Sequence, residues 1–417
     1  MLYKRYYCKW NWRQVDKQII DLISKEVKRQ REGIELIPSE NYVSKNVLEA
    51  MGSFLTNKYS EGYAGMRYYG GNKVIDEIEE VAIRRARELF STSYHVNVQP
   101  YSGSPANTAV YFALLRFGDK IMGMKLDHGG HITHGLPVSF SGKAYKVVSY
   151  GVDKETETIN YDDVRALALK EKPKLIICGA TAYSRKIDFK KFAEIARESG
   201  AILMADISHI AGLVAAGLHP SPFGYADVVT TTTHKTLRGP RGAVIFCKNK
   251  YKEAIDKAVF PGLQGGPHNH ITAAKAVCFF EASTPGFKSY CKQVIKNCRC
   301  LGDEFKKYQR KVISGGTDNH LLLIDVRSYG INGKKAQEIL DNVNISVNKN
   351  TIPFDTLSPN IASGIRIGTP AVTSREMKEK DMLEIARFIE RALLGGSQEK
   401  LKKEVSSFAK QFKLPGE

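Results

Sequence analysis

The chain has 417 residues, of which 42% are hydrophobic and 25% charged, and its mean hydropathy is −0.30. These values are typical of a globular protein of two or three domains, and no apolar run approaches the roughly 20 residues of a transmembrane helix. Lysine and arginine exceed aspartate and glutamate by 18. Such an excess favours either a nucleic-acid partner or a polyanionic substrate that binds at a basic active-site entrance.

The N-terminal segment Met1–Arg13 is basic and aromatic, with no acidic residue before Asp16. It lacks the apolar stretch of a secretory signal, and a mitochondrial presequence is an open alternative although the segment contains no serine. No other compact basic run is interleaved with aromatic residues, so we predict no dedicated nucleic-acid partner. The seven cysteines are scattered, with only Cys298 and Cys300 close together, which favours a reducing compartment. We therefore predict a cytoplasmic protein.

Apolar residues at helical spacing predict an amphipathic N-terminal helix that ends near Gly33 and serves as an arm. These residues are Val15, Ile19, Leu22, Ile23 and Val27. Ser39, Glu40 and Asn41 follow in a turn-rich segment, where their simplest role is to cap a helix over Val47–Met51.

Helices and strands alternate from Lys73 onward, which predicts an α/β domain with a largely parallel sheet. The expected strands are Asn97–Tyr101, Lys120–Leu126, Tyr145–Tyr150, Leu175–Gly179, Ile202–Asp206, Val228–Thr232 and Ala243–Cys247. The expected helices are Lys73–Phe90, Pro105–Leu115, Phe189–Ser199 and His268–Ala282. The preceding segment Asn57–Gly71 is dense in Tyr, Gly, Arg and Glu, so it is unsuited to a helix and costly to order without a function.

After Pro285 and Gly286 the sequence predicts a smaller α+β domain. Its expected elements are helix Ser289–Tyr308, strand His320–Val326, helix Lys334–Val343, strand Ile345–Asn348, helix Arg375–Leu394 and helix Gln398–Phe412. We therefore expect an N-terminal helical arm over residues 1–53, a large α/β domain over residues 54–285 and a small domain over residues 286–417.

The stretch Thr230–Gly242, TTTTHKTLRGPRG, carries the clearest chemical signal. A β-branched run that is typical of a buried strand ends in His234 and Lys235, before a turn rich in Gly and Pro. Burial can lower the pKa of such a lysine, and its amine then becomes a carbonyl nucleophile able to form a Schiff base. A lysine that simply reaches solvent is the commoner alternative.

Two further features match the needs of pyridoxal phosphate (PLP), which requires an amine for its aldehyde, a carboxylate for its pyridine nitrogen and a cradle for its phosphate. Asp206 ends the apolar run of Ala201–His209. Ser102–Asn107, SGSPAN, predicts a helix N-terminus whose free N–H groups can bind an anion. Ser102, Asp206 and Lys235 all lie at the C-terminal ends of expected strands, where α/β proteins place their sites.

His128, His131 and His134 are the candidates for a metal site. Their spacing of three residues fits neither of the common zinc motifs, and apart from Asp127 no Cys or carboxylate completes a set. We predict no metal, and the alternative is that one imidazole lies flat on an aromatic cofactor.

Arg366 lies in the apolar strand of Gly364–Pro370, GIRIGTP. The simpler interpretation is a surface arginine on an edge strand. However, a guanidinium group can bind the carboxylate of an amino acid through two parallel hydrogen bonds, which makes Arg366 a candidate substrate clamp.

Six motifs, in order along the chain, closely resemble serine hydroxymethyltransferase. They are LIPSEN (36–41), NKYSEGY (57–63), RYYGG (67–71), HGGHITHG (128–135), TTTTHKTLRGPRG (230–242) and GGTDNH (315–320). The resemblance runs from about Ile19 to beyond Thr369 and is highly specific. It implies the PLP-dependent transferase fold type I, with a mostly parallel sheet in a large domain flanked by helices and a smaller C-terminal α+β domain.

The resemblance also implies a cofactor site. Lys235 would carry PLP, Asp206 would hold its pyridine nitrogen and His131 would stack on its ring. Further implied cofactor contacts are Ser102, Gly103, Ser104, Thr181, His209, Arg241, Tyr59, Gly265 and Gly266. Tyr59 and the two glycines would reach the PLP phosphate of a neighbouring subunit, so we expect a homodimer or a tetramer of dimers with shared sites.

For the substrates, the resemblance implies that Arg366 clamps the carboxylate of serine beside Ser39 and Tyr69. Glu61 would manage the hydroxyl proton, and His234 and Thr232 would be catalytic. The implied folate contacts are Leu126, Gly130, His131, Ile132, Asn350, Ser358, Pro359 and Asn360. Asn360 stands where the family has Phe, so one aromatic contact to folate is missing; Asp127 and Pro105 also depart from the expected Ala and Gln.

The implied reaction is the reversible conversion of L-serine and tetrahydrofolate to glycine and 5,10-methylenetetrahydrofolate, in one-carbon metabolism and amino-acid biosynthesis. The alternative enzyme is a PLP-dependent aldolase acting on β-hydroxy amino acids without folate. It would need Lys235, Asp206 and Arg366 but not the pocket of Leu126 and Asn350. A basic RNA-binding protein on an enzyme fold is an alternative of another class, suggested by charge alone.

Overall fold

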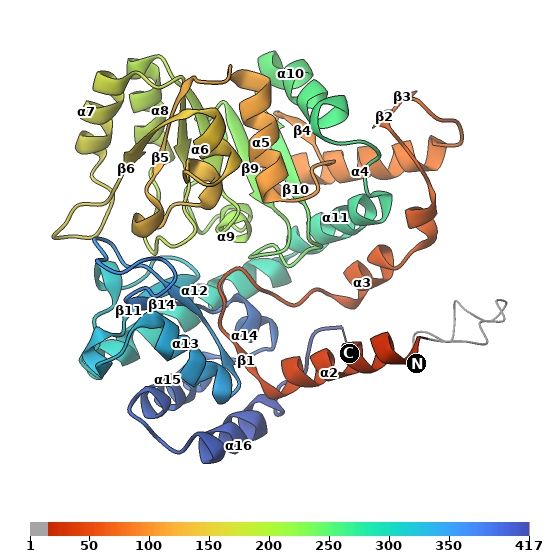
Figure 1. Cartoon of the computed structure of the whole chain (residues 1–417). Coiled ribbons are helices and arrows are strands. Elements are labelled where there is room, and N and C mark those ends of the chain that lie inside the picture. Colours follow the sequence, from red (N-terminus) through yellow and green to blue (C-terminus); the bar gives the residue numbers. More distant parts are fainter. Residues whose placement is uncertain (1–15, 417) are drawn as a thin grey trace.

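The computed structural model describes residues 16–416, which form two parts, each built around its own β-sheet (Figure 1). Val15 and the basic segment Met1–Arg13 lie outside the described residues. Within residues 16–416, no helix combines the length and the apolar character needed to cross a membrane.

The first part contains a seven-stranded sheet. Its strands are β4 (His95–Asn97), β5 (Lys120–Met124), β6 (Lys146–Tyr150), β7 (Leu175–Cys178), β8 (Ile202–Asp206), β9 (Val228–Thr232) and β10 (Ala243–Cys247). Their order in space is β4-β10-β9-β8-β7-β5-β6, and of these seven strands only β10 runs against its neighbours. The predicted α/β class with a largely parallel sheet is confirmed.

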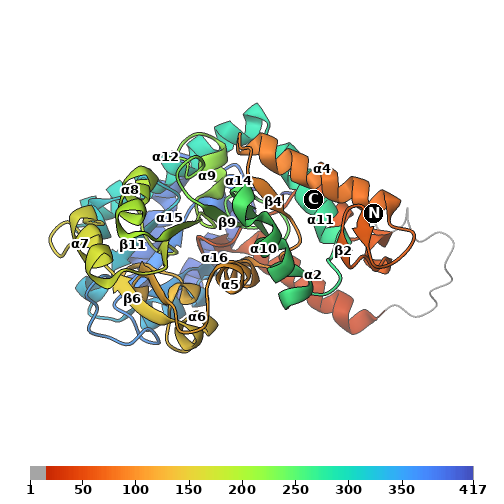
Figure 2. The same ribbon diagram turned by 90° about the horizontal axis from the view of Figure 1, so that it is seen from above.

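Both faces of this sheet are covered, which explains why strands such as β7 (LIIC) and β10 (AVIFC) are continuous apolar runs. In β7, Leu175 and Ile177 join the core beneath α5 (Gly103–Leu114) and α10 (Lys252–Lys257), whereas Ile176 and Cys178 join the core on the other face. The remaining helices of this part are α4 (Lys73–Leu89), α6 (Phe140–Ala144), α7 (Tyr161–Glu171), α8 (Phe189–Ser199), α9 (Ala211–Ala215) and α11 (Asn269–Ala282). Helices α4 and α11 pack side by side (Figure 2).

The second part contains the antiparallel sheet β11-β14-β13, in which β14 is the central strand. Its elements are α12 (Pro285–Lys307), β11 (Leu321–Asp325), α13 (Gly333–Asn342), β13 (Asn348–Asn350), β14 (Gly364–Gly368), α14 (Pro370–Ser374), α15 (Glu379–Leu393) and α16 (Gln398–Ala409). The helix that was predicted over Arg375–Leu394 begins later, at Glu379, and ends at Leu393. Glu376 has a positive φ of 66°, which a helix does not allow, and it separates α14 from α15.

The N-terminal segment joins both parts. Helix α2 (Lys17–Glu32) is followed by β1 (Ile34–Glu35), which pairs in parallel with β12 (Ile345–Ser346) of the second part. The chain then crosses to α3 (Lys45–Met51), which packs on α11 of the first part. The cap of α3 is Ser44, whose side chain accepts from Val47 N–H, so Ser39 is free for another role. The domain boundaries after residues 53 and 285 remain our proposal.

The fully buried Arg375 fixes this N-terminal segment in place. Its guanidinium donates to the carbonyl oxygens of Gln30 and Gly33 at the end of α2, and to those of Ala409 and Phe412 at the end of α16. The carbonyls at a helix C-terminus lack the full set of intrahelical partners, and a buried cation satisfies and stabilises them.

Candidate active site

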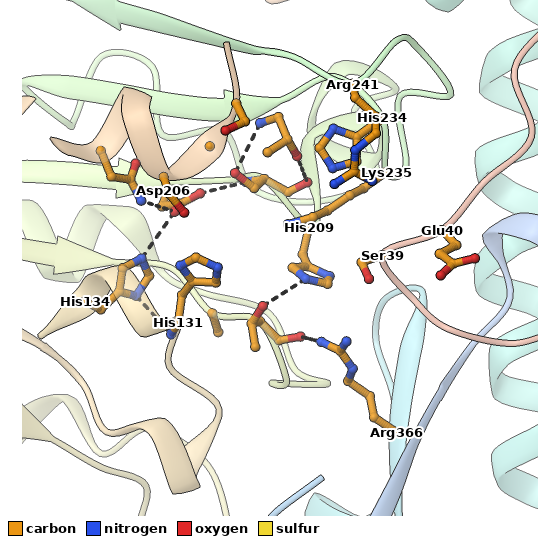
Figure 3. A pocket seen from close by; sticks show the side chains of 18 residues that line it. Ser39, Glu40, His131, His134, Asp206, His209, His234, Lys235, Arg241 and Arg366 are labelled. Carbon is orange, nitrogen blue, oxygen red and sulfur yellow. Dashed lines mark hydrogen bonds and ion pairs between the residues drawn. The ribbon is translucent and has the colours of Figure 1, made fainter. Parts of the chain in front are cut away.

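A cavity of about 480 Å³ lies where β7, β8 and β9 end and α5 begins, next to the second part of the molecule (Figure 3). The predicted site residues that line it are Ser39, Ser102, Gly103, Ser104, His131, Thr181, Asp206, His209, Thr232, His234, Lys235, Arg241 and Arg366. Residues that line it but were not predicted are Glu40, Asn107, His134, Ala180 and Ser208. In the view of Figure 3, Lys235 and His234 lie at the upper right, Asp206 lies to their left and Arg366 lies below them.

Lys235 follows β9 in a tight turn. The N–H of Gly239 donates to the carbonyl of Thr233 (2.7 Å), and the N–H of Arg238 donates to that of Lys235 (3.1 Å). Lys235 is only 8% exposed, which excludes the alternative of a lysine that reaches solvent. Burial, together with the charges of Arg366 and Arg241, lowers the pKa of Lys235 to about 8 although Asp206 opposes this. About a tenth of the amine is therefore neutral and nucleophilic at pH 7, far more than for an ordinary lysine.

Asn41 holds the backbone of this lysine. Its side-chain amide donates to the Lys235 carbonyl (2.8 Å) and to the Tyr290 hydroxyl (2.9 Å), while its oxygen accepts from Ser374. One amide thereby connects the N-terminal segment, the lysine turn and the second part. Sequence reasoning noted Asn41 but predicted no such contact.

Asp206 ends β8 and faces the cavity with its carboxylate already hydrogen bonded. Oδ2 accepts from Asn107 (2.8 Å) and from His134 Nε2 (3.2 Å), and Oδ1 accepts from the N–H of Ser208 (3.0 Å). Burial alone would raise the pKa of Asp206, but the hydrogen bond from His134 and the neighbouring imidazoles lower it well below its ordinary value. Asp206 is thus a stable buried anion that suits a protonated ring nitrogen.

The three histidines predicted not to bind metal point to different partners. His128 Nδ1 accepts from the N–H of Val152, His131 Nδ1 contacts Thr133, and His134 Nε2 donates to Asp206. Burial lowers the pKa of His131 to about 4, so its ring is neutral. In the part of the chain that the structure describes, no group of three or more metal-ligating side chains forms.

His209 lies between the two parts of the molecule. Its Nε2 is 3.0 Å from the Thr181 hydroxyl and its Nδ1 is 3.2 Å from Nε2 of the fully buried His320. Burial lowers the pKa of His209 well below its ordinary value, so this imidazole is neutral as well. Thr181 and His209 therefore form one polar edge of the cavity.

The N-terminus of α5 forms an anion cradle. Ser102 precedes the helix and makes no side-chain cap, and no backbone carbonyl accepts from the N–H groups of Gly103 or Ser104 within residues 16–416. A Cβ atom at Gly103 would lie 2.8 Å from the Thr232 methyl group, so only glycine allows this close approach. Free N–H groups at a helix N-terminus bind phosphate well.

Arg366 is a buried cation without an acidic partner. It lies on the central strand β14 rather than on an edge strand, and it is 8% exposed. Nε donates to Asn348 Oδ1 (3.0 Å) and Nη1 donates to the Thr181 carbonyl (2.6 Å), while no carboxylate of residues 16–416 pairs with it. Burial lowers its pKa to about 10. The position can therefore accept a carboxylate from a ligand.

A second cluster of predicted residues lies away from the cavity. The Tyr59 hydroxyl donates to Glu61 Oε1 (3.1 Å), and its ring packs edge-on against Tyr69 at 5.3 Å. A Cβ atom at Gly265 would lie 3.1 Å from Glu61 Oε1, and one at Gly266 would lie 3.2 Å from the Tyr59 ring. None of these five residues lines the cavity of the same chain.

Apart from His131, the predicted folate contacts lie outside the cavity lining, in two segments of the chain. One segment contains Leu126, Gly130 and Ile132 and also includes His131. Gly130 has no room for a side chain, because a Cβ atom would lie 2.1 Å from the Met124 carbonyl oxygen. Asn350 ends β13. Ser358, Pro359 and Asn360 are exposed on the loop that follows it.

PLP requires an amine, a carboxylate and a phosphate cradle at mutually accessible positions, and Lys235, Asp206 and the α5 N-terminus all face one cavity. The unpartnered buried Nδ1 of His234 beside Lys235 is a further sign that this cavity accepts a polar ligand. Together with the seven-stranded sheet, these features define a PLP-dependent enzyme of fold type I. The family model described as serine hydroxymethyltransferase matches residues 12–389. The chain belongs to the serine hydroxymethyltransferase family, whose members use PLP and take tetrahydrofolate as co-substrate, so the predicted family, enzyme class and cofactors are confirmed.

Proposed function

We propose that the chain catalyses the reversible transfer of the serine hydroxymethyl group to tetrahydrofolate, giving glycine and 5,10-methylenetetrahydrofolate, in the cytoplasm. The observation that carries this proposal is the buried guanidinium of Arg366, which lacks an acidic partner among the described residues and faces the same cavity as Lys235. An amino-acid carboxylate is the ligand that this arrangement fits. When bound, PLP supplies an electron sink for the bond that is broken at the substrate's α-carbon.

The residues of the chain would hold this cofactor at four points. Lys235 would be its covalent attachment site, and Asp206 would keep the ring nitrogen protonated because its carboxylate is fixed as an anion by three hydrogen bonds. The neutral ring of His131 would stack on the cofactor, and the α5 N-terminus would bind its phosphate. Thr181 and His209 would hold the edge that carries the 3-hydroxyl group, and Arg241, Thr232 and His234 line the same cavity.

The same residues would determine which bond of the substrate breaks. Arg366 and Ser39 hold the carboxylate, which fixes the bond from the α-carbon to the hydroxymethyl group in the orientation that favours its cleavage. Asn348 and the Thr181 carbonyl hold two nitrogens of Arg366, so this orientation is set before substrate binds. Glu61 would take the hydroxyl proton of serine.

We further propose that the site is shared within a homodimer, itself able to pair into a tetramer. The second cluster described above is held together by contacts among its own residues, but none of them lines the cavity of the same chain. It could therefore contribute to the site of a second copy. Its residues are Tyr59, Glu61, Tyr69, Gly265 and Gly266. An exposed apolar surface also needs a partner. Four residues on α2 supply such a surface, each about half exposed: Ile19, Ile20, Leu22 and Ile23.

Mixed dimers test this sharing. Lys235→Ala and Glu61→Gln should each be nearly inactive alone, but mixed dimers of the two variants should recover about half of the wild-type activity, because each mixed dimer has one of its two sites with both residues intact. The measurement is the activity of mixed dimers purified with two different affinity tags. No recovery above the sum of the two single variants would place Glu61 and Lys235 in the same chain's site.

Absorbance spectra test the reaction itself. The purified protein should be yellow, and a red-shifted visible band should develop when glycine and tetrahydrofolate are both added. Cleavage of β-hydroxy amino acids with a spectrum indifferent to tetrahydrofolate would instead identify the folate-independent aldolase. A protein that stays colourless after added PLP would overturn both.

A further inference from the structure

The loop between β13 and β14 is held rigidly by one carboxylate. Asp355 accepts hydrogen bonds from the N–H groups of Ile352 (3.2 Å), Leu357 (2.9 Å) and Ser363 (2.8 Å), and from the Ser363 hydroxyl (2.7 Å). Burial would raise the pKa of Asp355, but these hydrogen bonds lower it below its ordinary value. The residue before it, Phe354, is therefore held on an ordered scaffold.

Phe354 occupies a backbone position that does not suit it. The N–H of Asp355 donates to the Ile352 carbonyl (3.0 Å), which closes a four-residue turn with Pro353 second and Phe354 third. Phe354 has φ of +61°. Proline followed by a positive φ is the pattern of a type II turn, whose third position favours glycine or asparagine. For a bulky side chain this conformation is strained, and such strain is frequently found where the side chain serves a function.

Packing does not explain why a phenylalanine is retained there. Phe354 remains 45% exposed. Its ring lies against that of His128, with ring centres 4.6 Å apart at an angle of 60°. His128 is buried and fixed by the N–H of Val152, and a Cβ atom at Gly151 would lie only 2.4 Å from its Nδ1. The result is an aromatic ring that rests on an immobile base and keeps much of its surface open.

This ring contacts a segment that leads into the cavity wall. His128 is followed by Gly129, whose carbonyl accepts from Thr181 N–H (2.8 Å), and by His131, and both Thr181 and His131 line the cavity. In the sequence, Phe354 also follows β13, whose first residue Asn348 accepts from Arg366 Nε. Phe354 is not itself a lining residue, but it is joined through His128 and β13 to residues that are.

We propose that Phe354 is a specificity residue that stacks against the flat aromatic part of the tetrahydrofolate co-substrate. This inference rests on the proposed function. Phe354 thereby supplies the aromatic contact that Asn360, an exposed residue on the same loop, does not provide. The strained turn orients the ring toward a ligand instead of toward the protein core.

Phe354→Gly tests the proposal through two changes of opposite direction. Removal of the strain should raise the melting temperature by about 1 to 3 °C. Removal of the ring should weaken tetrahydrofolate binding by about three- to tenfold, the usual contribution of an aromatic pair, without changing glycine affinity or PLP retention. Phe354→Tyr, which keeps the ring, should bind folate like the wild type, whereas Phe354→Leu should resemble Phe354→Gly in affinity.

A matched control and the contrary outcomes complete the test. Glu376→Gly relieves a similar positive φ at an exposed position on another element, so it should raise stability and leave folate binding unchanged. If Phe354→Gly lowers the melting temperature and binds folate normally, the ring is a packing residue on His128 and the inference is wrong. If the wild type itself binds no tetrahydrofolate, the proposed function fails, and this inference fails with it.

Discussion

Replacement of Lys235 with alanine should lower kcat for serine cleavage by about 1,000-fold or more, the largest loss expected from any single substitution. The variant keeps the rest of the cavity but loses the amine that we propose as the attachment site of PLP. It should therefore bind PLP reversibly and release it on dialysis, whereas the wild type stays yellow. Borohydride reduction followed by peptide mapping should place the cofactor on Lys235 in the wild type.

The pH dependence of cofactor binding measures the pKa of the Lys235 amine. Since only the neutral amine attacks an aldehyde, and burial lowers the pKa of Lys235 to about 8, the rate at which the cofactor-free protein takes up PLP should rise with pH and reach half its maximum near pH 8. An ordinary lysine would place this midpoint above pH 10.

Lys275 is the matched control. Burial lowers its pKa to about 7, but its ammonium group donates to the carbonyls of Val98, Pro100 and Ala243 and lies outside the cavity. Lys275→Met should destabilise the fold, yet the folded fraction should retain PLP covalently. Covalent PLP in Lys235→Ala would show that another lysine is the attachment site.

Replacement of Arg366 with alanine should raise KM for serine by roughly 100-fold, which corresponds to about 3 kcal/mol. The loss is large because the guanidinium is buried and is already oriented by Asn348 and Thr181. Arg366→Lys should recover little, because an ammonium group cannot form two parallel hydrogen bonds with a carboxylate. Steady-state kinetics with serine and equilibrium binding of glycine measure the effect.

Asn348→Ala separates binding from orientation in the same site. It leaves the charge of Arg366 but removes the acceptor for Nε, so KM for serine should rise less than in Arg366→Ala. PLP retention should be unchanged in all these variants. An unchanged KM in Arg366→Ala would mean that the substrate carboxylate binds elsewhere.

Local composition predicts the central strands well. A strand covered on both faces is rich in apolar and β-branched residues, and the predicted strands Ile202–Asp206, Val228–Thr232 and Ala243–Cys247 coincide with β8, β9 and β10. The prediction was wrong for Ile345–Asn348. This stretch is divided between β12, which pairs with β1, and β13, which pairs with β14, and local composition does not encode which partner a strand finds.

A similar division holds for the candidate site. Lys235, Asp206 and Arg366 could be singled out because a charged residue at the end or in the middle of an apolar strand is unusual. His134 and Asn348 could not, because each acts on a residue that is distant in the sequence. Asn107 had a usable signal, since it lies one helical turn after Gly103 and so shares its face. The catalytic and binding roles themselves remain predictions.

The pairing of β1 with β12 has a consequence for how the protein is made. Ile34 lies near the start of the chain and its partner Ile345 near the end, so the first strand leaves the ribosome long before its partner exists. At elongation rates of about 5 to 20 residues per second, this wait lasts roughly 15 to 60 seconds. Ser39, which lines the cavity, and Asn41, which binds the Lys235 carbonyl, lie just after β1. Because the position of β1 depends on β12, the nascent chain cannot assemble a working site until almost all of it has been synthesised.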